Sequence, residues 1–327
     1  MRIEFRRGYN VFFKKGWNVT YVAPHAGPAF ETVTSRDENT ETVASLCWMR
    51  TGGKIIVSSL PRKRALGIDF NRGIPPKGLS IRLFQDFIVD SNTEMLFEFR
   101  KKYAWSAKDE RDYQKRLKIY RSFWNEVKQG SFIVLIHRCF SRLKNVPTIM
   151  DISTFDGMGI ERDVLKKAVE EVNRKNRDFF KKIEKEYKAV ILLEEERIVQ
   201  NLTRIFGEFP PNLNKIENEY VEHFVNDTKV MKKYCPVHVF RKLQESFTPR
   251  NFLYACKKAL ENVETPRITV EHIFKGSKSI GPRKQLLSKK RKVINIESMA
   301  FMNFWYPHKA AEMIVDIIEI IDGEALK

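Results

Sequence analysis

Runs of apolar, β-branched and aromatic residues alternate with amphipathic stretches in the first half of the chain. Runs typical of buried strands lie at residues 17–23, 54–60 and 148–153. Apolar residues at helical spacing predict helices at residues 39–49, 109–127 and 132–143. Because strands and helices alternate, we predict an α/β fold, with a mixed, largely parallel sheet flanked by helices.

The middle of the chain changes character. From residue 161 onward apolar positions recur at helical spacing for about a hundred residues, with no convincing strand pattern between them. Strand patterns and a closing amphipathic helix then return at residues 267–274, 292–296 and 309–321. We therefore predict a helical insertion at 161–265 within an α/β domain made of residues 1–160 and 266–327.

The composition is that of a globular protein, with 43% hydrophobic and 31% charged residues among 327. No run approaches the roughly 18 consecutive apolar residues of a membrane span, and the first residues are basic, unlike a signal peptide. Four scattered cysteines are too few for a disulfide scaffold. We expect a soluble cytoplasmic protein without a membrane partner. The many Lys and Glu residues and few Gln residues are typical of a thermophilic source.

The net charge is the unusual figure, at +18 from 59 Lys and Arg against 41 Asp and Glu. Such a field attracts anions, including nucleic acid, phosphorylated metabolites and carboxylate substrates, and does not choose among them. Residues 274–292 alone hold eight basic residues and no acidic one. This segment is a nucleic-acid contact, an anion-attracting lid over a pocket, or a solvated loop.

Four motifs follow predicted strands, where α/β sheets present their functional loops. In the first, His25 leaves a strand into a Gly/Pro-rich turn, with Glu31 close enough to share a metal ion. In the second, Asn71 and Arg72 offer an amide and a guanidinium suited to gripping a carboxylate, and Asp69 is placed to orient the arginine. A structural histidine and a loop arginine bridged to an acid remain the alternatives.

The third and fourth motifs each contain an acid at the end of a predicted strand. Asp151 precedes Ser153 and an Asp-Gly pair, and it either forms the rim of an active site or caps the next turn. Glu297 ends an apolar strand and is suited to act as a general base for a metal-activated water. A salt-bridged acid at the sheet edge is the alternative for Glu297.

Together and in this order, the four motifs resemble the N-formylglutamate amidohydrolase family, a branch of the zinc-carboxypeptidase-like fold. Pro24-His25-Ala26-Gly27 resembles the family's PHxG turn, and residues 68–72 resemble its DxNR motif. Residues 148–155 resemble its DxHSF strand, and residues 274–276 with 293–297 resemble its closing FxG and QxE stretch. The resemblance covers about residues 17–155 and 267–322, and the helical middle has no counterpart in it.

The resemblance implies zinc as cofactor, with His25 and Glu31 as ligands, and Glu297 as the base that takes a proton from water. It implies Asn71 and Arg72 as groups that bind the substrate carboxylate, and we add Ser153 and Lys275 as further substrate-binding candidates. We expect His25, Glu31, Arg72, Asp151 and Glu297 to converge on one cleft.

The sequence departs from the family at Ser153, where the family has a third ligand histidine. A serine hydroxyl stays protonated near neutral pH and is a poor zinc ligand. Three outcomes remain open: Asp151 or Asp156 replaces the histidine, His137 reaches in from a neighbouring element, or the metal site is lost. We take Asp151 as the candidate third ligand, because the apolar neighbours of His137 favour a core histidine.

Two classes of function follow. The first is a metal-dependent hydrolase that cleaves an amide bond next to a carboxylate, acting on a small carboxylate-bearing or polyanionic substrate. The second is a catalytically inactive member of the family that binds nucleic acid or an acidic protein partner, with residues 274–292 as the contact for nucleic acid.

Overall fold

The structure is a computed structural model. It describes residues 1–29, 36–89, 91, 93–139, 143, 146–207, 228–276, 279–287 and 291–326. Its strands are β1 Arg2–Arg6, β2 Tyr9–Lys14, β3 Val19–Ala23, β4 Gly53–Ser58, β5 Phe132–Cys139, β6 Thr148–Ser153, β7 Arg267–Val270 and β8 Lys292–Met299.

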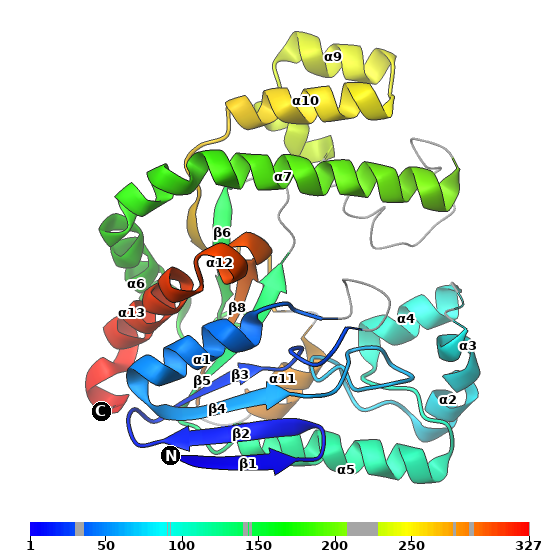
Figure 1. Ribbon diagram of the computed structural model, residues 1–327, viewed down its shortest axis with the longest axis vertical. Coiled ribbons are helices and arrows are strands. Elements are labelled where there is room, and N and C mark those ends of the chain that lie inside the picture. Colours follow the sequence, from blue (N-terminus) through cyan, green and yellow to red (C-terminus); the bar gives the residue numbers. More distant parts are fainter. Residues whose placement is uncertain are drawn as a thin grey trace. The chain divides into compact units, whose positions relative to one another are not determined.

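The helices of the described residues fall into three stretches of the chain (Figure 1). Before β6 they are α1 Thr40–Thr51, α2 Lys77–Arg82, α3 Phe84–Ile88, α4 Glu94–Lys102 and α5 Glu110–Val127. Between β6 and β7 they are α6 Arg162–Lys175, α7 Arg177–Phe206, α9 Val237–Glu245 and α10 Pro249–Glu261. The last are α11 Ile280–Leu286, α12 Ala300–Trp305 and α13 Pro307–Leu326.

The strands form one mixed sheet in the order β1-β2-β4-β3-β5-β8-β6-β7. The four central strands β4, β3, β5 and β8 run parallel, whereas β2 pairs antiparallel with β4 and β6 pairs antiparallel with β8. The predicted mixed α/β fold is therefore confirmed. The sequence patterns had also indicated β3, β4, β6, β7 and β8, but not the β1–β2 hairpin that extends the sheet.

One predicted element is wrong. Residues 132–143 were expected to be helical, but residues 132–139 form β5, the strand between β3 and β8. Both faces of β5 are covered, so its apolar residues run on without the alternation of a half-exposed strand. Periodicity does not distinguish such a run from a buried helix, and the β-branched residues Ile133, Val134 and Ile136 were the better guide.

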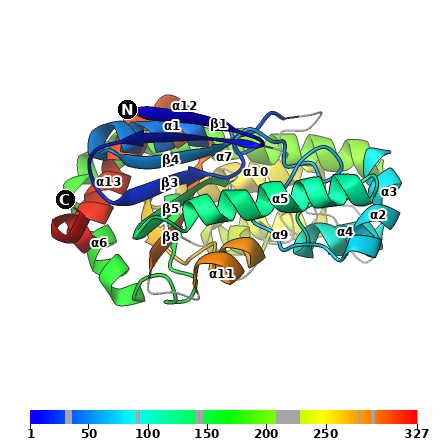
Figure 2. The same ribbon diagram turned by 90° about the horizontal axis from the view of Figure 1, so that it is seen from below.

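Helices cover both faces of the sheet (Figures 1 and 2). Helices α1, α12 and α13 lie on one face, and α5 and α11 lie on the other. Alternate residues of β3 show this division, because the Tyr21 hydroxyl bonds to Thr51 of α1 while Val22 joins the core beneath α5.

Stacked aromatic rings fill the core beneath α5. The ring of Phe123 lies 3.8 Å from that of Phe70 and meets Tyr9 and Trp124 edge to face. These contacts join α5 to β2 and to the loop that follows β4. That loop carries Asp69 and Asn71, so the aromatic core supports the position of polar side chains that the next section describes.

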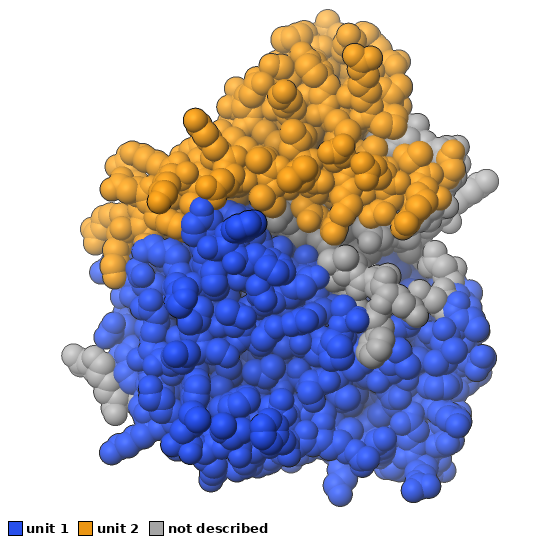
Figure 3. All heavy atoms as spheres, viewed as in Figure 1, with its two compact units in different colours: residues 1–139, 150–172, 269–327 blue, residues 140–149, 173–268 orange. Residues whose placement is uncertain are grey.

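The chain divides into two compact units, coloured separately in Figure 3. Unit 1 consists of residues 1–139, 150–172 and 269–327, and unit 2 of residues 140–149 and 173–268. Strand β6, helix α6 and strand β7 contribute residues to both. None of the helices in the described part of the chain combines the length and apolarity that a membrane crossing requires.

We expect Phe123→Ala to lower the free energy of unfolding by about 3–5 kcal/mol, because it leaves a cavity among rings that cannot collapse into it. Phe5→Ala is the matched control, since the Phe5 side chain is 80% exposed, and it should change stability by no more than about 0.5 kcal/mol. Urea denaturation of both variants measures the difference. Equal effects would contradict the assigned core.

Candidate active site

The sheet has a topological switch point between β3 and β5. From the carboxyl end of β3 the chain passes through α1 to β4 on one side, and from β5 it passes to β6, which lies on the other side. Connections that leave neighbouring parallel strands in opposite directions mark the strand ends at which α/β proteins place their ligand sites. The buried polar residues at these strand ends all belong to unit 1.

Two buried histidines and an aspartate meet at this switch point. His25 follows β3 directly, His137 lies near the end of β5, and their ring centroids are 4.9 Å apart. Asp37 Oδ2 lies 3.0 Å from His25 Nδ1 and 2.9 Å from His137 Nδ1. The Asp37 backbone N–H donates to the His25 carbonyl, which holds Asp37 beside the end of β3.

The outer nitrogen of each imidazole has its own partner. His25 Nε2 lies 2.9 Å from Asp69 Oδ1, and His137 Nε2 lies 3.3 Å from Asn71 Nδ2. Asp69 Oδ1 also accepts the Asn71 backbone N–H, so the loop after β4 holds both partners in place. Such outer contacts fix the tautomer and orientation of a histidine.

Arginines balance the two buried carboxylates. Arg62 Nε and Arg64 Nη2 lie 3.1 and 3.0 Å from Asp69 Oδ2, and Arg62 Nη1 lies 3.8 Å from Asp37 Oδ1. Burial alone would raise the pKa of Asp69, but Arg62, Arg64 and His25 overcome it and hold the pKa well below its usual range. The pKa of Asp37 is also held well below its usual range, because His25, His137 and Arg62 outweigh its burial. Both groups are therefore anionic at neutral pH.

Glu297 lies beside this cluster on the next strand. It is the register partner of His137 across the β5–β8 pair, and its Oε1 accepts a hydrogen bond from Asn295 Nδ2. Burial raises the pKa of Glu297 to about 7, and the Asp37 charge adds to the effect while His137 and Asn295 oppose it. A carboxyl group with this pKa exchanges protons readily near neutral pH.

The donor set suits a divalent cation. His25, Asp37 and His137 each offer a ligand atom, and these atoms lie within 4.8 Å of one another. Two imidazoles and one carboxylate match the ligand types of zinc sites that keep an open position. When the Nε2–H of His25 donates to Asp69, the Nδ1 atom of His25 carries a lone pair that faces the Asp37 carboxylate. Nδ1 and Asp37 Oδ2 are then two acceptors only 3.0 Å apart, and a cation or a proton must lie between them.

The amide of Asn71 supports the same interpretation. Its Oδ1 is buried and accepts no hydrogen bond from any described residue. A half-turn of the amide, whose two ends are nearly isosteric, lets Oδ1 accept the Nε2–H of His137. The Nδ1 lone pair of His137 then faces Asp37 Oδ2, as the Nδ1 lone pair of His25 does.

The predicted site residues separate into distinct groups. His25, Asn71 and Glu297 lie at or beside the histidine–aspartate cluster, but Glu31 lies outside the described residues. The Arg72 Nε donates to the Arg100 carbonyl of α4, and Lys275 is exposed. Their predicted roles in metal and substrate binding remain predictions.

Asp151 and Ser153 make other contacts. Strand β6 runs antiparallel to β8, so it points away from the carboxyl ends of β3 and β5; Asp151 pairs in register with Glu297, and Ser153 with Asn295. The Asp151 carboxylate accepts the backbone N–H groups of residues 272–274 and the Thr269 hydroxyl. The Ser153 hydroxyl accepts the N–H of Phe155 and lies beside Gly276. Neither residue belongs to the set of converging ligand atoms.

Asp37 was missed as a site residue, and His137 was an open alternative. Asp37 has no motif around it, because its role depends on a loop that folds back to His25. The signal for His137 was present in the sequence, since a histidine near the end of a β-branched run is typical of a strand end. The helical assignment of residues 132–143 concealed it.

Comparison with known proteins gives one structural likeness. No protein-family model and no curated protein sequence matches the chain. The fold is similar to the crystal structure of N-formylglutamate amidohydrolase from Ralstonia eutropha JMP134, with a TM-score of 0.41 and 9% sequence identity. The match covers 96% of this chain and 97% of that chain.

Glu297 should make stability depend on pH. Its pKa rises from an ordinary 4.5 to about 7 on folding, so the unfolded chain releases the proton first and stability falls as pH increases between these values. Glu297→Gln removes this loss. With chelator present, the free energy of unfolding of Glu297→Gln minus that of wild type should increase between pH 4.5 and pH 7, by no more than about 3 kcal/mol. Above pH 7 this difference should level off. A difference independent of pH in urea denaturation would contradict the assigned environment.

Proposed function

We propose that the protein is a metal-dependent hydrolase that cleaves an amide bond next to a carboxylate, in the manner that its resemblance to N-formylglutamate amidohydrolases implies. The observation that carries the proposal is the convergence of His25, Asp37 and His137 at the switch point of the sheet, with Glu297 on the adjoining strand. Catalytic sites of α/β proteins are built at such strand ends.

His25, Asp37 and His137 would hold the metal, with zinc as the ion that best suits this donor set. Such an ion, when bound, polarises an amide carbonyl and lowers the pKa of water. His137 takes the part of the third ligand histidine that the resemblance first assigned to Ser153. Asp69 and Asn71 keep the two imidazoles in the ligating orientation through their Nε2 atoms.

Glu297 is the general base in this proposal. Its partly buried carboxylate accepts a proton from the attacking water and delivers it to the leaving amine, and a pKa near 7 serves both transfers. Asn295 holds the carboxylate in position through its hydrogen bond to Oε1. Because β8 is a central strand, neither group moves far during the reaction.

Positive charge beside the cluster favours a substrate with a carboxylate. Arg62, Arg64 and Arg72 lie close enough to interact electrostatically, and the side chain of Arg62 is 27% exposed. Burial lowers the pKa of Arg64 to about 9, with Asp69 opposing, so Arg64 remains charged at neutral pH. This field would draw the carboxylate of an N-acylated amino acid toward the site.

We expect zinc to bind at about one ion per chain and to be lost in His25→Ala and His137→Ala, since each variant removes a ligand. Asp69→Asn should weaken zinc binding by about 10–100-fold through the orientation of His25. Ser153→Ala should bind as wild type does. Elemental analysis and zinc titration of chelator-treated protein measure these effects. A wild type that takes up no divalent metal would exclude the hydrolase and leave a non-catalytic binding protein.

Glu297→Gln should retain the metal and lower kcat for hydrolysis of an N-acylated acidic amino acid by about 10²–10⁴-fold, because the base acts in the transition state. KM should change little. Glu98→Gln, which neutralises an exposed acid on α4, is the control and should keep full activity. Turnover by Glu297→Gln at the wild-type rate would show that another group is the base.

A further inference from the structure

Beyond its first residue, Glu110, the solvent face of α5 carries cations and amides but no exposed acid. After Glu110, every fully exposed residue of this helix is basic or an amide: Arg111, Gln114, Lys115, Lys118, Arg121 and Asn125. The helix buries its aromatic residues against the sheet, so packing explains the buried face. Packing does not explain why the opposite face excludes carboxylates, which ordinarily alternate with lysine on a solvated helix.

The acids of α5 are all neutralised by ion pairs. Glu110 pairs with Lys77, and Asp112 pairs with Arg116 within the helix. Glu126 is buried and lies between two cations, with Lys54 Nζ at 2.5 Å and Arg6 Nη1 at 2.9 Å. The exposed cations are different. No hydrogen bond or ion pair joins the side chains of Arg111, Lys115, Lys118 or Arg121 to any described residue.

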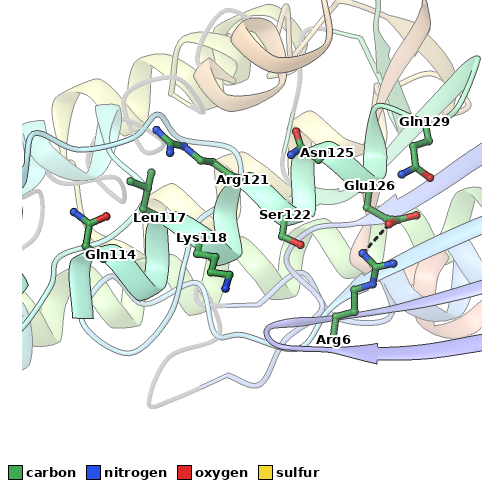
Figure 4. A pocket seen from close by; sticks show the side chains of 9 residues that line it. All are labelled: Arg6, Gln114, Leu117, Lys118, Arg121, Ser122, Asn125, Glu126 and Gln129. Carbon is green, nitrogen blue, oxygen red and sulfur yellow. Dashed lines mark ion pairs between the residues drawn. The ribbon is translucent and has the colours of Figure 1, made fainter. Parts of the chain in front are cut away.

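A groove of about 410 Å³ lies along this face, within unit 1. Its lining comes from the solvent side of α5 and from Arg6 of the β1–β2 hairpin, which reaches across to Glu126 (Figure 4). The groups that line it include donors from Gln114, Lys118, Arg121, Asn125 and Gln129. Among the described residues that line it, Leu117 is the apolar member and none has an aromatic ring.

We propose that this groove and the adjoining basic stripe bind the phosphate backbone of a nucleic acid. The four exposed cations lie between residues 111 and 121, a helical rise of about 15 Å, which fits a line of phosphates better than a single anion. The amides beside them donate to phosphate and sugar oxygens. Without aromatic rings for stacking or a helix free to enter a groove of the duplex, binding is independent of base sequence.

This surface is separate from both sites considered so far. None of its residues belongs to the metal-ligand cluster, so the inference does not depend on the proposed hydrolase activity. It also differs from residues 274–292, the segment whose composition first suggested a nucleic-acid contact. Of that segment, residues 277–278 and 288–290, which include Lys289 and Lys290, lie outside the described residues.

The test compares Lys118→Gln/Arg121→Gln with wild type in binding a fluorescent 20-nucleotide strand and the corresponding duplex, followed by anisotropy over a range of salt concentrations with chelator present. Two lost contacts should reduce the log–log salt slope by about 1.4 for the single strand and about 1.8 for the duplex. Near 0.1 M salt the single strand should bind about 25-fold more weakly. Both side chains are exposed and unpaired, so thermal stability should not change.

Lys181→Gln/Lys185→Gln is the matched control, because it removes the same charge from exposed positions of α7 and should bind as wild type does. Glu297→Gln should also bind normally, which separates this inference from the hydrolase. Loss of affinity in the α7 control equal to that in the α5 variant would reduce the effect to bulk charge and overturn the proposal. So would unchanged binding by the α5 variant, or a groove that binds tripolyphosphate but neither oligonucleotide.

Discussion

A carboxylate removed from water requires cations or hydrogen-bond donors around it, and the site depends on two such carboxylates meeting at one imidazole. Asp37 and Asp69 lie on opposite sides of His25, at 3.0 and 2.9 Å from its two ring nitrogens. An uncompensated charge of this kind costs several kcal/mol. The loop after β4 supplies Arg62 and Arg64 and strand β5 supplies His137, and together these groups balance the two carboxylates.

The same principle holds the neighbouring loops. Asp151 at the end of β6 accepts backbone N–H groups from residues 272–274, and Glu271 after β7 accepts them from Thr154 and Asp156. Each carboxylate thus anchors the turn that follows the other strand. Phe155, Asp156 and Glu271 have φ values of 58°, 60° and 54°, which non-glycine residues rarely adopt. The exchanged hydrogen bonds offset this strain, and they explain why Asp151 serves the loops rather than the metal-ligand set.

The molecule uses charge in two different ways. At the carboxyl ends of β3 and β5 the carboxylates are buried and each is opposed by cations or imidazoles at fixed positions, an arrangement suited to binding a small ion. On the outer face of α5 the cations are exposed and have no opposing acid among the described residues, so they contribute little to folding and are available to an approaching anion. The arginines beside the histidine–aspartate cluster are offset by Asp37 and Asp69, so they add little to the net charge of +18. The exposed cations of α5 are not offset in this way and contribute more to it.

The sequence by itself determined those helices and strands whose ends are set by residues close along the chain. Thr248 and Pro249 begin α10 as expected, with the Thr248 hydroxyl accepting the Asn251 N–H. The alternation of strands and helices determined the α/β class. His25, Asn71 and Glu297 could be named as candidates because each follows or ends a recognisable strand, and they lie at or beside the same cluster. Tertiary structure alone decided the rest. Residues 132–139 became a strand because both of their faces are covered by helices. Asp37 and His137 entered the site because loop closure and strand order bring together groups 100 residues apart. Ser153 left it because β6 runs antiparallel to β8. Strand direction and order depend on how all the faces of the sheet are buried at once, and no local run of residues specifies that.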